Sequence, residues 1–517
     1  MVPLFSLRSP QSWGLGEIGD LATFLPWAES AGLRLVQLLP INEMPFGEAS
    51  PYSALSAMAV DPQFISMGAV EDFTAIGGEH GLEPGLRHRL AAVRAAEAID
   101  YRQVRILKFA ALRQAYAYFV ERELPARSRR AQAFRAFAAE QAWWLDGYAL
   151  FRALHAWHEG RPWTEWPEGI RRRDPATVAE ARAALSDEIR FRQYVQWLAS
   201  EQWRAVRASA GNVALFGDLP FMVALDSADV WERQDEYRLD VSVGVPPDAF
   251  SETGQDWRLP AYDWDVFAAR DFDWLRRRAR RNAELFDGYR VDHLVGYYRT
   301  YVRPHDGSPA HFMPADEAAQ TQLGEQVLGV FRASGAEIVA EDLGTVPDFV
   351  RASQARLGVP GCKVMRWERQ WQAPGQPFTD PRDYPELAVA TSGTHDTEPM
   401  VAWWAATPAE ERAALLAVPS VGRGLDDAER EAAIAGPLMA PGLRDRVLEA
   451  LYASRAYLII LPMQDLFGWD DRINEPATIG EHNWTWRMRW TTDELRTRAE
   501  SVSVAARLRG WTDAHGR

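Results

Sequence analysis

The chain has 517 residues, a net charge of -15, 47% hydrophobic and 25% charged residues, and a single cysteine. This length suits several modules or one barrel enlarged by insertions, and the composition is that of a folded globular protein. The acidic balance disfavours nucleic acids and anionic membranes as partners, and one cysteine excludes an internal disulfide or a cysteine-rich metal site.

The first residues, MVPLFSLRSPQSW, lack the basic and apolar regions of a secretory signal. The longest apolar stretch, near residues 457–462, is too short to cross a bilayer. We therefore expect a cytoplasmic protein without membrane contact.

Short apolar runs alternate with longer amphipathic stretches along the chain, as in βα units. The predicted strands, in chain order, are residues 33–41, 57–65, 214–221, 286–294, 337–343, 363–367, 387–394 and 456–463. Eight such runs predict an α/β fold, a (β/α)8 TIM barrel with helical insertions and long loops over its C-terminal face.

We expect residues 1–517 to form a single catalytic barrel module. Residues 66–211 show helical periodicity without convincing strands and are predicted to form a mainly helical insertion. Residues 226–273 are dense in Trp, Tyr, Pro, Gly and Asp and lack clear periodicity, so they are predicted to form an irregular active-site loop region.

Acidic residues stand at the ends of four predicted strands, namely Asp218, Asp292, Glu341 and Asp396. Each one alone is explained equally well as the N-cap of the following helix. In barrel enzymes, however, the reacting side chains project from the C-terminal ends of the strands. Four carboxylates at that position together favour a catalytic cluster.

The spacing of these residues points to glycoside chemistry. Arg290 and Asp292 are two residues apart in a strand, so the guanidinium faces the carboxylate and keeps it ionised as a nucleophile. Glu341 follows an apolar run, where desolvation and a nearby carboxylate raise the pKa of a general acid. A retaining glycosidase needs such a pair about 5 Å apart. His395, beside Asp396, is placed to bind sugar hydroxyls.

Three other readings remain open. Asp292, His293, Glu341, His395 and Asp396 are residue types that bind zinc, but no His-x-His or His-Glu-x-x-His pair occurs and Arg290 opposes a cation. The stretch from Gly14 to Gly19 matches the G-x-G-x-x-G dinucleotide pattern, although its spacing from the preceding apolar run is wrong and no acid ends the next strand. A barrel that only binds glucan is the non-enzyme alternative.

Nine segments across nearly the whole chain resemble those of the 4-α-glucanotransferases, glycoside hydrolase family 77. They are WGLGEIGD, LVQLLPIN, SPYSALSAMAVDP, GDLPFMVALDSADVW, GVPPDAFSETGQDW, YRVDHLVGYYR, VAEDLGTVP, GTHD and NEPATIGEHNWTWR. The resemblance implies transfer of an α-1,4-glucan segment from one maltodextrin to the 4-hydroxyl of an acceptor glucan or glucose, through a covalent glucosyl-enzyme. An amylase-like hydrolase is the alternative activity.

The resemblance also implies roles for individual residues. Asp292 would be the nucleophile, Glu341 the acid/base and Asp396 the third carboxylate. The implied substrate-binding residues are Arg290, His395, Asp218, Tyr52, Gln255, Trp257 and Asn474. Family members use no metal or organic cofactor. The chain departs from many relatives at Ala249, at Arg258-Leu259 and at Thr397-Glu398-Pro399, so donor length and acceptor choice do not follow from the resemblance.

Overall fold

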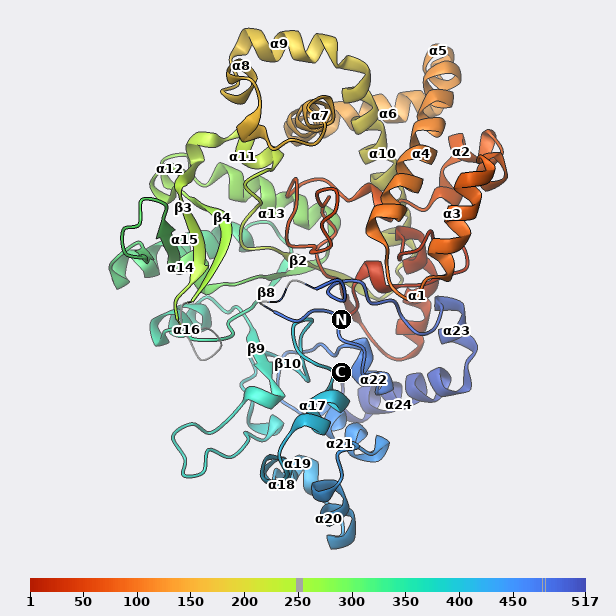
Figure 1. Cartoon of the computed structure of the whole chain (residues 1–517). Coiled ribbons are helices and arrows are strands. Elements are labelled where there is room, and N and C mark those ends of the chain that lie inside the picture. Colours follow the sequence, from red (N-terminus) through yellow and green to blue (C-terminus); the bar gives the residue numbers. More distant parts are fainter. Residues whose placement is uncertain (248–253, 477, 479) are drawn as a thin grey trace.

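The central element is a curled parallel sheet. A computed structural model describes residues 1–247, 254–476, 478 and 480–517; Ala249 lies outside them. Among these residues seven strands pair in the order β1-β2-β5-β8-β9-β10-β11, all parallel (Figure 1). Their bounds are β1 Leu35–Gln37, β2 Ala214–Leu219, β5 Gly288–Val291, β8 Glu337–Ala340, β9 Gly361–Val364, β10 Ala388–Thr391 and β11 Leu458–Ile459.

The two edges of this sheet are joined by the first residues of the chain. The amino group of Met1 donates to the Leu461 carbonyl at 2.6 Å, beyond β11, and the Val2 N–H donates to the Gln37 carbonyl of β1 at 2.9 Å. Inside the curl, a separate buried cluster consists of Phe216, Val339 and Val389 from three strands and Ile460, the residue after β11. A packed interior of this kind is typical of the TIM barrel, and the predicted fold class is confirmed.

One predicted strand is wrong. Residues 57–65 contain only a single bridge, between Val60 and Asn42, followed by a 3-10 helix at Pro62–Phe64. The Asp61 side chain accepts the Gln63 N–H and caps that turn, and proline cannot donate to a ladder. The segment folds back against residues 41–43 instead, and its apolar side chains are buried there without a strand.

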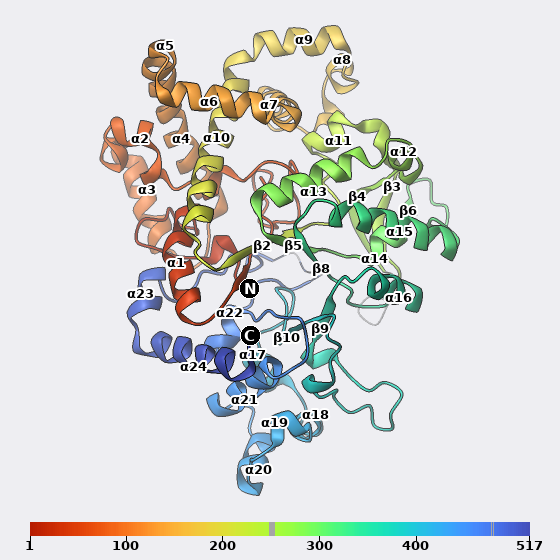
Figure 2. The same ribbon diagram turned by 180° about the vertical axis from the view of Figure 1, so that it is seen from behind.

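Helices account for most of the chain and gather at opposite ends of the molecule (Figures 1 and 2). Helix α1 (Ile18–Ser30) precedes β1. Between β1 and β2, at one end, lie α2 (Glu71–Ala75), α3 (Pro84–Ala95), α4 (Tyr101–Tyr118), α5 (Leu124–Ala126), α6 (Arg129–Glu140), α7 (Ala142–Trp157), α8 (Glu168–Arg171), α9 (Pro175–Ala184) and α10 (Ser186–Ser209). At the other end lie α17 (Met400–Ala406), α18 (Ala409–Leu416), α19 (Pro419–Gly422), α20 (Asp427–Ala435) and α21 (Pro441–Tyr452).

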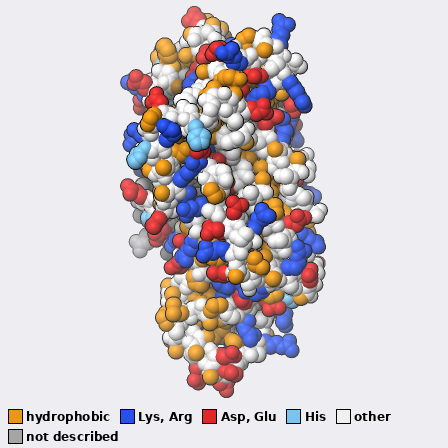
Figure 3. All heavy atoms as spheres, turned by 90° about the vertical axis from the view of Figure 1, so that its right-hand side faces the viewer, with side chains coloured by type: hydrophobic (Ala, Val, Ile, Leu, Met, Phe, Trp, Pro, Cys, Tyr) orange, Lys and Arg blue, Asp and Glu red, His pale blue; other side chains and the backbone are white. Residues whose placement is uncertain are grey.

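The remaining helices connect or cover the strands. They are α11 (Ala228–Glu232), α12 (Trp264–Ala269), α13 (Asp273–Leu285), α14 (Val295–Tyr298), α15 (Glu317–Arg332), α16 (Asp348–Arg356), α22 (Met463–Phe467), α23 (Thr492–Thr497) and α24 (Ala499–His515). No helix in the described part of the chain is both long and apolar enough to span a membrane. Figure 3 shows acidic and basic side chains interspersed over one face of the molecule.

The segment 226–273, expected to be irregular, contains two strands. They are β3 (Tyr237–Val245) and β4 (Gln255–Tyr262), which pair with β6 (Thr300–Pro304) and β7 (His311–Met313) in a four-stranded antiparallel sheet of order β4-β3-β6-β7. Register shifts near Val243 interrupt the pairing of β3 with β4. A bulge of this kind destroys the two-residue alternation by which a strand is recognised in a sequence.

The glycine-rich stretch before α1 is a packing turn. A Cβ on Gly16 would lie 2.0 Å from the Leu4 carbonyl oxygen, and Gly14 has φ +87° with Val93 close by. Glu17 follows, and its side chain forms a capping box with Asp20 at the start of α1. The glycines thus allow the chain to pass close to its own first residues, which explains the false dinucleotide pattern.

Candidate active site

Most of the predicted site residues lie at the carboxyl ends of the sheet strands, where parallel barrels place their reacting groups. Asp218 is in β2 and Arg290 is its register partner in β5. Asp292 is the first residue after β5, and Glu341 is the first after β8. The parallel pairing of β2 with β5 and of β5 with β8 therefore brings these four side chains to the same end of the sheet. We call this end of the sheet, where the four side chains meet, the mouth.

Arg290 connects the carboxylates. Its Nη1 lies 2.8 Å from both carboxylate oxygens of Asp218 and 2.9 Å from Oδ1 of Asp292, and its Nη2 lies 4.0 Å from Oε2 of Glu341. The Asp218 carboxylate is inaccessible, whereas the side chains of Asp292 and Glu341 are 21% and 14% exposed. Asp218 thus anchors the guanidinium, and the other two carboxylates keep access to the mouth.

The Glu341 carboxylate is held by backbone donors. His293 N–H donates to Oε2 at 2.8 Å and Leu343 N–H donates to Oε1 at 3.1 Å. Desolvation by burial, reinforced by repulsion from Asp292 and opposed by Arg290, raises the pKa of Glu341 to about 7. At neutral pH this group therefore exists in both protonation states, as an acid that later acts as a base requires.

A second part of the site lies after β10. His395 Nε2 is 3.3 Å from Oδ2 of Asp396 and 3.2 Å from the Tyr52 hydroxyl, and that hydroxyl donates to Asp218 at 2.8 Å. Asn474 donates its amide N–H to Oδ1 of Asp396 at 2.7 Å. These contacts join Tyr52, His395, Asp396 and Asn474 to the Arg290 group through Asp218.

The charges of this part support one another. Burial disfavours ionisation of Asp396, but His395 and the Asn474 amide outweigh it and lower the pKa of Asp396 to about 2. Burial likewise opposes the charge on His395, yet the Asp396 carboxylate raises the pKa of His395 above its ordinary value. With 41% of its side chain exposed, Asp396 is an accessible and permanently ionised group.

Strand β4 brings two further predicted residues to the edge of the mouth. The Trp257 ring stands edge-on to His293, with ring centroids 4.9 Å apart, and its Nε1 donates to the Gln255 side chain at 3.2 Å. His293 follows Asp292 and has a left-handed φ of 46°, a conformation that side chains adopt only under constraint. Gln255 and Trp257 are therefore linked through His293 to the Glu341 carboxylate.

The structure adds residues that the sequence did not single out. The Trp484 ring lies 5.7 Å from the rings of both Tyr52 and His395, and Arg472 donates to the Asp396 carbonyl at 3.0 Å. Both stand close to Asn474 in the chain, and Trp484 lies within a stretch that resembles the family. The segment NEPATIGEHNWTWR, which contains Trp484, was the signal in the sequence. A pattern alone does not show which of its side chains face the site.

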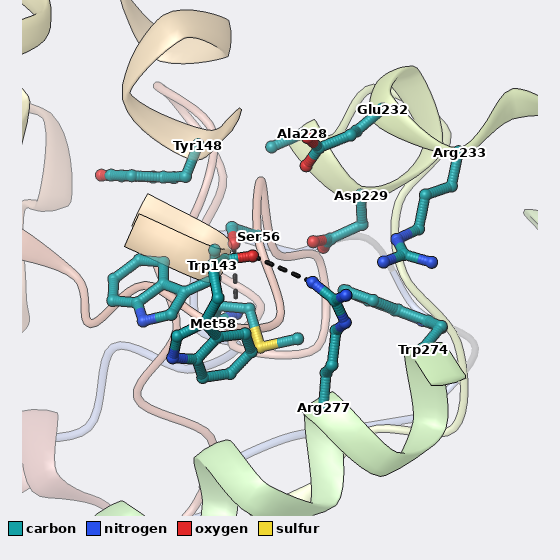
Figure 4. Close-up of a pocket in the computed structure, with 11 residues that line it drawn as sticks. Ser56, Met58, Trp143, Tyr148, Ala228, Asp229, Glu232, Arg233, Trp274 and Arg277 are labelled. Atoms are coloured by element: carbon teal, nitrogen blue, oxygen red, sulfur yellow. Dashed lines mark hydrogen bonds between the residues drawn. The ribbon is translucent and has the colours of Figure 1, made fainter. Parts of the chain in front are cut away.

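A cavity of about 40 Å³ lies elsewhere, between α7, α11, α13 and residues 56–58 (Figure 4). In it, the Asp229 side chain accepts the Ala57 N–H at 2.7 Å, and Arg277 donates to the Trp143 carbonyl. None of the predicted site residues lines it. A space this small holds a few water molecules rather than a sugar ring.

The described residues contain no group of three or more His, Cys, Asp or Glu side chains arranged to hold a metal ion. The carboxylates of Asp218 and Asp292 contact the guanidinium of Arg290.

Comparison with known proteins identifies the family of this chain. The family model of the 4-alpha-glucanotransferases, glycoside hydrolase family 77, matches residues 2–492. The 4-alpha-glucanotransferase of Thermus thermophilus is 34% identical over 98% of this chain and 96% of its own, and that of Chlamydia pneumoniae is 30% identical over 96% and 91%.

A solved amylomaltase from Streptococcus agalactiae, in complex with acarbose, superposes with a TM-score of 0.82 and 26% identity, covering 100% of this chain and 98% of that one. A Corynebacterium glutamicum amylomaltase shares the fold, with a TM-score of 0.79, 23% identity, and coverage of 98% and 74%. The chain therefore belongs to the 4-α-glucanotransferases of glycoside hydrolase family 77, enzymes that transfer α-1,4-glucan segments.

Proposed function

We propose that Asp292 is the nucleophile and Glu341 the acid/base of a retaining double displacement. The observation that carries this assignment is the asymmetric environment of the two carboxylates. Asp292 contacts the guanidinium of Arg290 at 2.9 Å, whereas Glu341 is 4.0 Å from it and has its pKa raised to about 7, chiefly by burial. Two carboxyls in such different environments suit the two different roles.

In the first step, an Asp292 oxygen forms a bond to the anomeric carbon of the donor while the glycosidic bond breaks. Protonated Glu341 gives its proton to the leaving oxygen, so the released fragment departs with a neutral hydroxyl. In the second step, Glu341 takes the proton from the 4-hydroxyl of an acceptor, and that oxygen displaces Asp292. The products are a lengthened glucan and the regenerated enzyme.

The remaining residues would bind and distort the reacting sugar. Asp396, His395 and Asn474 offer an ionised carboxylate and hydrogen-bonding groups on one side of the mouth, and hydrogen bonds to ring hydroxyls strengthen as the sugar distorts. Tyr52 contacts both His395 and Asp218, and Asp218 in turn holds Arg290. Gln255 and Trp257 would cover the cleft, so that an oriented sugar hydroxyl competes with water.

Donors and acceptors would be maltooligosaccharides, with glucose as the smallest acceptor. These sugars carry no charge. A neutral substrate is compatible with the net charge of -15, which would repel a phosphorylated one. The cytoplasmic location expected from the sequence stays a prediction.

The test is incubation of purified protein with maltotriose, followed by chromatography of free glucose and of oligosaccharide length, with Asp292→Asn as the control. A ladder of longer maltodextrins plus glucose supports transfer by this site. Products that only shorten while reducing ends increase would contradict transfer in favour of hydrolysis, and a fully active Asp292→Asn protein would contradict the assignment of the nucleophile.

A further inference from the structure

The segment that carries His395 and Asp396 has no regular structure of its own. Strand β10 ends at Thr391 and helix α17 begins at Met400, and the residues between them form turns and bends. The geometry of these two side chains is therefore set by hydrogen bonds within the turns and by contacts from outside the segment. Errors of about 1 Å in such a geometry reduce a rate by on the order of 10²-fold.

Asp465, in α22, contacts both ends of this segment. Its Oδ2 accepts the Ser392 hydroxyl at 2.5 Å, and its Oδ1 accepts the Met400 N–H at 2.7 Å. Ser392 stands three residues before His395, and Met400 stands four residues after Asp396. One carboxylate thus closes the base of the loop, because each of its oxygens binds one end.

This carboxylate is buried and has no exposure through which to take part in the reaction. Asp465 is 1% exposed and Ser392 is fully buried. The nearby guanidinium of Arg366, itself 6% exposed, donates from Nε and Nη2 to the Ser392 carbonyl at 3.4 and 3.3 Å. Removal of Asp465 would leave a buried hydroxyl and a buried N–H without their acceptor, and both ends of the loop would move to find new partners.

The same stretch of chain also holds the top of the loop. Arg472 donates to the Asp396 carbonyl and Asn474 to the Asp396 side chain. The chain following β11 therefore contacts the loop at both its base and its tip. Unlike Arg472 and Asn474, Asp465 lies out of reach of the reacting sugar, since both of its carboxylate oxygens bind the base of the loop.

We propose that Asp465 is a positioning residue for the transfer reaction, which sets the geometry of His395 and Asp396 by joining Ser392 to Met400. This inference rests on the roles proposed above for His395 and Asp396. It predicts that loss of Asp465 acts on the transition state through these two residues. The free energy of unfolding alone would not report that effect.

The experiment compares kcat and KM for glucose release from maltotriose, together with Tm, in five variants. Asp465→Ala should lower kcat and kcat/KM together, on the order of 10²-fold, with a much smaller change in KM. Asp465→Asn should recover most of kcat, because its oxygen accepts from Met400 and its amide donates to Ser392. Ser392→Ala removes only one of the two contacts and should lower kcat about fivefold.

Asp72→Ala is the matched control. Asp72 is also 1% exposed and accepts hydrogen bonds from Tyr194 and Arg130, but it lies in the helical part of the chain. It should lose stability and keep kcat. If Asp465→Ala keeps its kcat, if Asp72→Ala loses as much, or if Asn does not recover activity, the positioning role is overturned. Should Asp465→Ala not fold, an unchanged kcat in Ser392→Ala overturns it.

Asp396→Asn separates this inference from the proposed function. If Asp396→Asn keeps its kcat, the role proposed for Asp396 fails, and the positioning inference falls with it. If Asp396→Asn loses activity while Asp465→Ala does not, the proposed function stands and only the positioning role is wrong.

Discussion

Glu17 and Glu341 are two buried glutamates whose pKa values are both raised to about 7, chiefly by burial. Glu17 lies at the start of α1, bound to the ammonium of Lys108 at 2.5 Å and to the Trp13 N–H at 2.8 Å, and both partners of the ion pair are almost fully buried. Glu341 lies at the strand ends, has backbone donors, and keeps 14% of its side chain exposed.

The comparison teaches that a raised pKa does not by itself mark a catalytic acid. Structural ion pairs perturb pKa values as strongly as active sites do. The two glutamates differ in their partners and access. The Glu341 side chain keeps partial exposure beside a second carboxylate, whereas Glu17 is enclosed against the Lys108 side chain. Four predictions test this contrast, in order of expected effect.

The largest effect is expected at the nucleophile. Asp292→Asn should lower kcat for maltotriose by at least about 10⁴-fold, because no covalent glucosyl-enzyme forms. Circular dichroism and Tm should show a folded protein. The equivalent change in the helical region, Asp72→Asn, should leave kcat unchanged; similar losses in both would mean that the mouth carboxylate acts only through folding.

Glu341→Gln should lower kcat for maltotriose by about 10²–10⁴-fold, the range expected for loss of an acid/base. The loss in rate should be far smaller for fluoride release from the donor α-glucosyl fluoride in a single turnover, since fluoride leaves without being protonated. The measurement is a comparison of the two donors in single-turnover kinetics. Equal losses with both donors would show that Glu341 does not protonate the leaving group.

The pH profile should include the loss of the Glu341 proton on its alkaline side. Its acid form is present below its pKa of about 7 and disappears above it, so kcat should fall about tenfold per pH unit well above pH 7. Asp396, whose pKa is lowered to about 2, stays ionised throughout. A Glu17→Gln variant should keep the same profile. A shift of the fall in kcat above pH 7 in that variant would show that Glu17 also affects the reaction.

Glu17→Gln should affect stability and leave catalysis intact. It leaves the buried ammonium of Lys108 without its carboxylate, which costs about 3–5 kcal/mol of the free energy of unfolding. Urea denaturation measures this loss, and kcat of the folded fraction should equal that of the parent protein. A reduced kcat with unchanged stability would show that Glu17 takes part in the reaction.

The sequence predicted the fold where burial has a regular period. Each of the seven parallel strands overlaps a predicted run, and for β2, β5 and β8 the run also contains the predicted site residue at the strand end. The prediction failed where burial has no period. Residues 57–65 are apolar because they are buried as a folded-back coil, and β3 and β4 were missed because their register shifts near Val243.

The positions of the predicted site residues follow from the same rule. A carboxylate after an apolar run reaches the mouth because parallel strands end at one edge of the sheet. The positions of Asp292 and Glu341 could therefore be predicted from the sequence pattern. Tyr52 and Asn474 lie far from those strands in sequence, and the family resemblance alone pointed to them. Asp465 was not predicted, because its role depends on two contacts across 65 and 73 residues of chain.

The most direct test of the double displacement is to trap its intermediate. Glu341→Gln protein is mixed with α-glucosyl fluoride, quenched in acid and analysed by mass spectrometry of the intact protein and of its peptides. The account predicts a mass increase of one glucosyl unit on the peptide that contains Asp292, absent when Asp292→Asn is added to the same variant. No adduct while fluoride is released, or an adduct on a different carboxylate, would contradict Asp292 as the nucleophile.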